Sequence, residues 1–270
     1  MNKLLVDLIK LCRYAGKHPD YVQGGGGNCS IKTSDKIAIK ASGYFLEEVS
    51  LKNGFVLLDR KTLKPVLNNH LRPSLETYIH LLLGKYIIHT HPIVVGALVC
   101  TKGGEKTLKK IFKEKNYYWV NYASPGKDLS CKIKKLMASK KINKDSQMAL
   151  FLENHGIFVS SSTIKGCIDL HEKIINKLKS YFKITNNNHK IKKSNYIIKG
   201  FLTPDQIVYS TIKPKKLSKK NKVAINETNV FLHKVIRLIK SKDWKVKYLS
   251  NANCKFIMNM EEEKYRQKVK

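Results

Sequence analysis

Three histidines are the residues of this sequence whose types and spacing could bind a metal. His89 and His91 stand two apart in the apolar run 86–91, which predicts a buried strand. Residues two apart on a strand share a face, so two imidazoles about 6–7 Å apart could both bind one ion. His155 interrupts a second apolar run, 149–159, where polar residues cost stability unless they have partners. Three histidines with one open position are typical of a catalytic zinc.

Glu76 is the candidate proton carrier beside these histidines. Pro73 suits the first position of a helix and Gly84 suits its end, so the sequence predicts a short helix with Glu76 in its first turns. His80 stands one turn further on, and we expect it to pack or to orient a neighbour, not to be a fourth ligand. A carboxylate near a metal can move the protons that cleavage of a carbon–carbon bond requires. The alternatives are a histidine pair that only packs and a glutamate that only faces a helix dipole.

Two glycine-containing turns are candidates for binding an anion. The run 23–30, QGGGGNCS, lets the backbone approach a ligand closely, while Asn28 and Ser30 offer side-chain hydrogen bonds. The sequence Ala-Ser-Gly at 41–43 predicts another tight polar turn. For the glycine run, a merely flexible turn is the alternative. The pattern matches neither a Walker loop nor a dinucleotide fingerprint.

The composition indicates one ordinary globular domain, with or without an extension. The chain has 270 residues, of which 42% are hydrophobic, and 52 basic residues against 20 acidic ones give a net charge of +32. Nearly all the basic excess is lysine, whereas dedicated nucleic-acid binders more often carry arginine. We therefore expect no nucleic-acid partner, although the charge would attract an anionic substrate. Because the six cysteines lack C-x-x-C spacing and no apolar run reaches the roughly 18–20 residues of a membrane span, we expect a cytoplasmic protein without a membrane partner.

The hydrophobic periodicity predicts helices and strands that alternate along the chain. The expected strands are 30–32, 36–40, 55–59, 86–91, 119–122 and a pair within 149–159. The expected helices, besides the short one near Glu76, are 3–16, 93–100, 107–115, 128–140 and 163–182. This order predicts an α/β fold around a mostly antiparallel or mixed sheet.

Residues 186–270 are predicted to be a C-terminal extension of a first domain that spans residues 1–185. A polar connector at 186–194 would separate the two parts, and a lysine-rich linker is expected at 213–222. Helices are expected at 226–240 and from residue 260 onward.

Five separate motifs of this chain resemble those of the class II aldolase/adducin family. They are G-G-N-x-S at 26–30, A-S-G at 41–43, P-S-x-E at 73–76, H-x-H-P at 89–92 and N-H-G at 154–156. The resemblance covers about residues 1–185, and the remainder resembles the extension of longer bacterial members related to rhamnulose-phosphate aldolases. It implies a three-layer α/β/α sandwich around the central sheet, usually assembled as a homotetramer.

The resemblance also implies a role for each motif. His89, His91 and His155 would hold one zinc ion per chain, and Glu76 would be the catalytic acid/base. The pocket for the substrate phosphate would be formed by Asn28, Ser42, Gly43 and Ser74. The implied activity is that of an aldehyde-lyase, a zinc-dependent aldolase that cleaves or forms a ketose phosphate or a related sugar derivative through a metal-stabilised enediolate.

Other activities in this family remain open alternatives. One is a sugar-phosphate 4-epimerase or a dehydratase on the same site, and another is a non-catalytic, adducin-like assembly module. Epimerases of the family carry aspartate at the position of Glu76, and adducin heads lack the histidine set.

The chain departs from the family pattern at two places. Phosphate-binding aldolases of this family typically have two serines before the glutamate, whereas here Ser74 is followed by Leu75, which removes a hydroxyl. Some members also use a catalytic tyrosine from a neighbouring subunit or from the C-terminus. The candidates for it are Tyr117, Tyr118, Tyr122 and Tyr209, and the sequence does not rank them.

Overall fold

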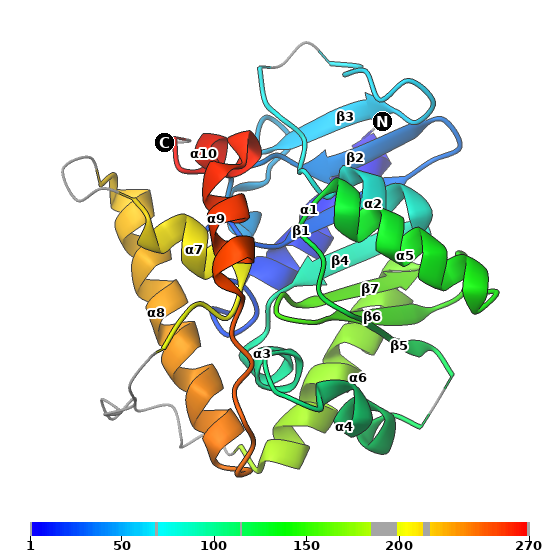
Figure 1. Ribbon diagram of the computed structural model, residues 1–270. Helices are drawn as coiled ribbons and strands as arrows, with labels where there is room; N and C mark the ends of the chain where they lie inside the picture. The colour runs from blue at the N-terminus through cyan, green and yellow to red at the C-terminus, as the bar shows by residue number, and fades with distance from the viewer. Residues whose placement is uncertain (1, 68–69, 114, 185–198, 213–216, 269–270) are drawn as a thin grey trace.

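A seven-stranded sheet with helices on both faces forms the centre of the protein (Figure 1). The structure, a computed structural model, describes residues 2–67, 70–113, 115–184, 199–212 and 217–268. The strands are β1 (Asn28–Lys32), β2 (Lys36–Lys40), β3 (Phe55–Asp59), β4 (Tyr86–Thr90), β5 (Tyr117–Val120), β6 (Met148–Leu152) and β7 (Ile157–Ser161). The helices are α1 (Asn2–Gly16), the 3-10 helix η1 (Leu46–Glu48), α2 (Thr77–Leu82), α3 (Ile93–Val99), α4 (Gly104–Ile111), α5 (Lys127–Ser139), α6 (Ile164–Phe182), α7 (Pro204–Ser210), α8 (Lys219–Lys240), α9 (Asn251–Asn259) and α10 (Glu261–Arg266).

The sheet is mixed, as the sequence predicted. Its strand order is β3-β2-β1-β4-β7-β6-β5. Only the pair β5 and β6 is parallel, and the other neighbours in this order are antiparallel. The antiparallel register of β1 and β4 sets Asn28 opposite His89, so two predicted site residues become neighbours at one end of the sheet.

Alternate residues of the strands face two separate cores, which gives the three layers. Ile87 of β4 packs with Ile79 of α2 and Ile133 of α5. The next residue, Ile88, belongs to the core on the opposite face, with Leu8 of α1 and residues of α3 and α6. The predicted α/β/α architecture is therefore confirmed. In the described ranges, no helix combines the length and the apolar character that crossing a bilayer requires.

The start of α2 differs from the prediction. Pro73 does not open the helix, because it forms a β-bridge with Ala41, and the neighbouring Arg72 carbonyl accepts a hydrogen bond from the Ser42 amide. The helix begins only at Thr77, and Glu76 occupies the N-cap position. This bridge ties the segment before Glu76 to the Ala-Ser-Gly turn, so two of the sequence motifs come together.

The C-terminal helices pack directly on the first part of the chain. Phe231 and Val235 of α8 press against α3, where a Cβ on Gly96 would lie 2.7 Å from the Phe231 ring. The predicted linker 213–222 is partly wrong, because Ser218 caps α8 and residues 219–222 form its first turn. Residues 213–216, the predicted connector 186–194 and the boundary at 185/186 lie outside the described residues.

Candidate metal and substrate site

The predicted site residues gather around one hollow at the end of β1 and β4. The hollow holds about 30 Å³. Its lining includes Asn28, Ser42, Gly43, Ser74, Glu76, His91 and His155. His89 is fully buried directly beside it, with its Nε2 atom 3.0 Å from the Nε2 atom of His91.

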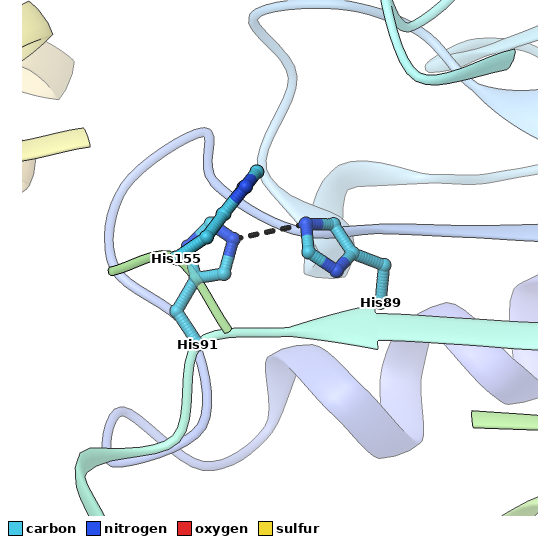
Figure 2. Close-up of side chains that lie close together, drawn as sticks. All are labelled: His89, His91 and His155. Atoms are coloured by element: carbon cyan, nitrogen blue, oxygen red, sulfur yellow. Dashed lines mark hydrogen bonds between the residues drawn. The ribbon is translucent and has the colours of Figure 1, made fainter. Parts of the chain in front are cut away.

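The three imidazoles converge with their Nε2 atoms available as electron-pair donors (Figure 2). Nδ1 of His89 donates to the Ile157 carbonyl at 3.0 Å, and Nδ1 of His91 donates to Oδ2 of Asp205 at 2.6 Å. With Nδ1 carrying the proton in both rings, the two Nε2 lone pairs face each other. Burial lowers the pKa of His155 to about 3, so this ring is neutral as well.

This donor set fits a divalent cation such as zinc. One nitrogen from each of the three histidines lies within 4.8 Å of the others. Facing lone pairs repel one another unless a cation lies between them, and three neutral imidazoles are a common zinc ligand set. Oε1 of Glu76 is also buried, lies 3.5 Å from Nε2 of His155 and has no hydrogen-bond partner among the described residues. A bound cation would accept the lone pairs of the three histidines and would leave Oε1 of Glu76 beside the metal, free to carry a proton.

The N-H-G turn between β6 and β7 places His155. Asn154 has a positive φ of 53°, and its side-chain amide donates to the carbonyls of Leu202 and Lys247 in the C-terminal part. Gly156 is required, because a Cβ there would lie 2.4 Å from the Thr90 carbonyl oxygen and 2.5 Å from Cδ2 of His91. The polar interruption of the predicted strand is thus a turn that fits tightly against the histidine pair.

Glu76 is held at its N-cap position by a neighbouring amide. Asn28 donates from Nδ2 to Oε2 of Glu76 at 2.9 Å, and the same oxygen lies 3.1 Å from Nε2 of His89. Burial alone would raise the pKa of Glu76, but its interactions with the imidazoles of His89 and His155 and the hydrogen bond from Asn28 outweigh burial and lower this pKa. Glu76 is therefore a carboxylate at neutral pH.

His80 orients Asn28 and is not part of the histidine cluster. Its Nε2 bonds to Oδ1 of Asn28, and its Nδ1 lies 2.7 Å from Oγ of Ser30. Burial lowers the pKa of His80 to about 3, so the neutral ring donates through Nε2 to Asn28 and accepts the Ser30 hydroxyl proton through Nδ1. The order His80, Asn28, Glu76 is a chain of donors that ends on the carboxylate.

The predicted anion-binding residues line the same hollow as the histidines. Ser74 accepts hydrogen bonds from Nδ2 of Asn28 at 3.1 Å and from the backbone N–H of Glu76 at 3.2 Å. Leu75 also lines this hollow and offers no side-chain hydroxyl there. No tyrosine is among the described residues that line it. The hydroxyl of Tyr209, the candidate that lies beside the site, accepts the Gly25 N–H at 2.7 Å and so holds the glycine run.

Sequence reasoning missed four residues that complete the hollow: Lys40, Asp205, Glu263 and Arg266. The last three come from α7 and α10, and Arg266 donates to Asp205 at 2.7 Å and to Glu263 at 2.9 Å. Burial alone would raise the pKa of Asp205, but Arg266 and His91 outweigh it and lower this pKa. Burial raises the pKa of Glu263 to about 7.

The glycine run is the feature of the sequence that reflects the packing of the C-terminal helices near the hollow. A Cβ at Gly26 would lie 2.2 Å from Oδ2 of Asp205, and one at Gly25 would lie 2.9 Å from the Tyr209 hydroxyl. At Gly24 it would lie 2.5 Å from Cβ of Ala224. The run is therefore glycine because the C-terminal helices pack against it, and not only because a ligand approaches it.

Comparison with known proteins identifies the family of this chain. Residues 6–182 match the model of the Class II Aldolase and Adducin N-terminal domain. The L-fuculose phosphate aldolase of Methanocaldococcus jannaschii is 30% identical over 199 residues, which are 68% of this chain and 97% of that protein. The N-terminal class II aldolase domain of a conserved Thermoplasma acidophilum protein superposes with a TM-score of 0.54 at 25% identity, covering 65% of this chain and 92% of that one. A sugar-phosphate aldolase from Thermotoga maritima shares the fold, with a TM-score of 0.56 at 17% identity over 71% of this chain and 98% of that one. The chain belongs to the class II aldolase and adducin family.

Proposed function

We propose that this protein is a zinc-dependent aldolase that cleaves or forms a ketose phosphate. The observation that carries the proposal is the convergence of three histidine Nε2 atoms beside the carboxylate of Glu76. The 30% identity to an L-fuculose phosphate aldolase supports a phosphorylated sugar as the substrate. His89, His91 and His155 would hold the metal. When bound, zinc supplies Lewis-acid stabilisation of the negative charge that develops on a substrate carbonyl oxygen.

Glu76 moves the proton in this proposal. Cleavage leaves an electron pair on the carbon beside the carbonyl, and that carbon must be protonated before the product leaves. Asn28 holds Oε2 of Glu76, so Oε1, which has no hydrogen-bond partner among the described residues, is the atom that carries the proton. His80 fixes the amide of Asn28 and thereby the carboxylate plane.

The direct test is an assay of bond cleavage on protein purified without chelators. The metal content is measured first, and a panel of ketose 1-phosphates is then assayed for release of dihydroxyacetone phosphate and an aldehyde. Cleavage that chelation abolishes and zinc restores would support the proposal. Epimerisation of a pentose phosphate without aldehyde release would favour the epimerase alternative. Protein that binds no metal and turns over no substrate would favour an assembly module.

We also propose a homotetrameric assembly in the cytoplasm, on the family resemblance. Sedimentation equilibrium of the zinc-loaded protein tests the assembly, since a tetramer has four times the 31.0 kDa mass of the chain. A monomer at the concentrations used in the cleavage assay would contradict it.

A further inference from the structure

Arg266 is a buried cation that the reaction described above does not use. It lies at the end of α10, lines the hollow with Glu76, Ser42 and Ser74, and its side chain is only 11% exposed. Burying a guanidinium is costly unless its donors are paired. The partners of its three nitrogens therefore decide whether it can still bind a ligand.

One N–H donor of the Arg266 guanidinium has no hydrogen-bond partner among the described residues. NH1 donates to both carboxylate oxygens of Glu263, at 3.2 and 2.9 Å. NH2 donates to Oδ1 of Asp205 at 2.7 Å and lies 3.5 Å from the Tyr209 hydroxyl. Nε is buried and has no hydrogen-bond partner among the described residues. An unpaired buried donor is costly, so a native protein keeps one only where something else accepts its hydrogen bond.

Lys40, the second cation that lines the hollow, already has hydrogen-bond partners for its donors. Its Nζ donates to the carbonyl oxygens of Gly25, Ala41 and Tyr44, at 3.1, 3.4 and 2.6 Å. An ammonium group has three donors, and all three are used on the backbone. Among the described non-histidine cations that line the hollow, Arg266 is therefore the one with a donor left for a ligand.

Arg266 lines the same hollow as Leu75, the position at which a hydroxyl is missing. Leu75 and Ser74 line the same hollow as Arg266, so the residue pair expected to bind phosphate offers one hydroxyl there. An arginine binds phosphate or carboxylate through two parallel hydrogen bonds and adds a full charge. We propose that Arg266, carried by the last helix of the chain, receives the anionic group of the substrate in place of the hydroxyl absent at Leu75.

Glu263 lines the hollow beside Arg266 and is the carboxylate with which an incoming anion competes for the guanidinium. The incoming anion takes over from Glu263 as a partner of Arg266. Glu263 is suited to this exchange, since its raised pKa of about 7 makes it an easily neutralised competitor.

This inference rests on the proposed function, but binding tests it apart from turnover. Inorganic phosphate is titrated calorimetrically into the zinc-loaded full-length protein and its variants. Arg266→Met should weaken phosphate binding about 10- to 150-fold, the loss expected for a hydrogen bond to a charged group. Zinc content and melting temperature are measured in parallel. A protein that binds phosphate through Arg266 but cleaves no ketose phosphate would refute the proposed function and leave this inference standing.

Arg72→Met is the matched control for the docking of α10. The Arg72 guanidinium stacks over the ring of Tyr265 on the same helix, 4.5 Å from its centroid, and Arg72 does not line the hollow. This variant should keep the phosphate affinity of the parent. Equal losses in the two variants would mean that helix docking, and not the guanidinium, governs binding, and would overturn the proposal.

Glu263→Gln is a second test that loss of folding cannot imitate. Removing the competing carboxylate should raise phosphate affinity, because the NH1 edge of Arg266 becomes easier to reach. Unchanged or weaker binding in Glu263→Gln would overturn the proposal. Tighter phosphate binding in Arg266→Met would also overturn the proposal, because it would mean that Arg266 keeps anions out of the hollow.

Discussion

Replacing Asp205 by asparagine tests how the C-terminal part contributes to the metal site. Asp205 lies between two donors, Nδ1–H of His91 at 2.6 Å and NH2 of Arg266 at 2.7 Å. A carboxylate accepts from both, whereas asparagine has one acceptor oxygen and must turn its NH₂ group toward one of them. Either His91 loses its charged acceptor, or its Nδ1 must accept, which places a proton on the Nε2 atom that would bind the metal.

The size of the effect follows from the bond that is exchanged. A hydrogen bond to a charged group is worth about 1.5–3 kcal/mol and a neutral one about 0.5–1.5 kcal/mol. The difference of about 1–2 kcal/mol corresponds to about 5- to 30-fold weaker zinc binding. Loss of a residue that orients a metal ligand typically weakens metal binding about 10- to 100-fold, and the range expected here overlaps that one.

Competition between the protein and a chromophoric chelator measures the zinc affinity. Glu227→Gln is the matched control, because Glu227 accepts the Gly24 N–H at 2.6 Å and so joins α8 to the same glycine run without touching a histidine. Asp205→Asn should lose zinc affinity while Glu227→Gln keeps it, with both variants folded by circular dichroism. Parent-like affinity in a folded Asp205→Asn variant would refute the idea that Asp205 orients His91.

Three further predictions concern the histidines and Glu76. His155→Ala should no longer retain stoichiometric zinc by elemental analysis, and a full complement in this variant would contradict the three-histidine site. Glu76→Gln should keep zinc and lose about 10²- to 10⁴-fold in kcat, the usual range for general acid–base catalysis, whereas loss of zinc instead would make the carboxylate a ligand. His171 is a buried residue of α6, and burial lowers its pKa from 6.5 to about 3. As the pH falls, the unfolded chain therefore takes up a proton at this histidine before the folded chain does. Stability from this group is present above pH 6.5 and is lost as the pH falls toward 3. His171→Gln should make the fall in the urea midpoint between pH 7 and pH 4.5 shallower, and an unchanged fall would show that other groups govern it.

Strands and site residues could be predicted where the signal is local. The strands 36–40 and 55–59 have the predicted bounds, because alternation and turn residues specify them. The histidine pair was predictable since a strand fixes which side chains share a face. The start of α2 could not be predicted. The bridge between Pro73 and Ala41 is a contact between distant segments, and it overrides the preference of proline for the first position of a helix.

The contribution of α7 and α10 to the site was not predictable from their own residues. Asp205 in a helix start and Arg266 in the charged segment MEEEKYR read as ordinary surface residues. Only the fold shows that Asp205 is buried against the glycine run and that Arg266 is paired with it. The four glycines were ambiguous for the same reason: close packing against a distant helix and close approach of a ligand both exclude a Cβ.

From the two hydrogen bonds of Asp205 we also expect zinc and an anionic ligand to bind cooperatively. Its Oδ2 accepts from His91 and its Oδ1 accepts from Arg266, so one carboxylate joins the proposed metal ligand to the proposed anion receptor. When an anion draws the guanidinium toward itself, more of the carboxylate charge is available to Nδ1–H of His91, which makes that ring a better ligand. Phosphate should therefore tighten zinc binding, by an amount in the approximate 5- to 150-fold range of such couplings, and zinc must tighten phosphate binding by the same factor. Direct attraction between zinc and phosphate contributes as well and does not depend on Arg266. Measuring both couplings in the parent and in Arg266→Met separates the two contributions, and a coupling that is equal in the two proteins would show that Asp205 does not transmit it.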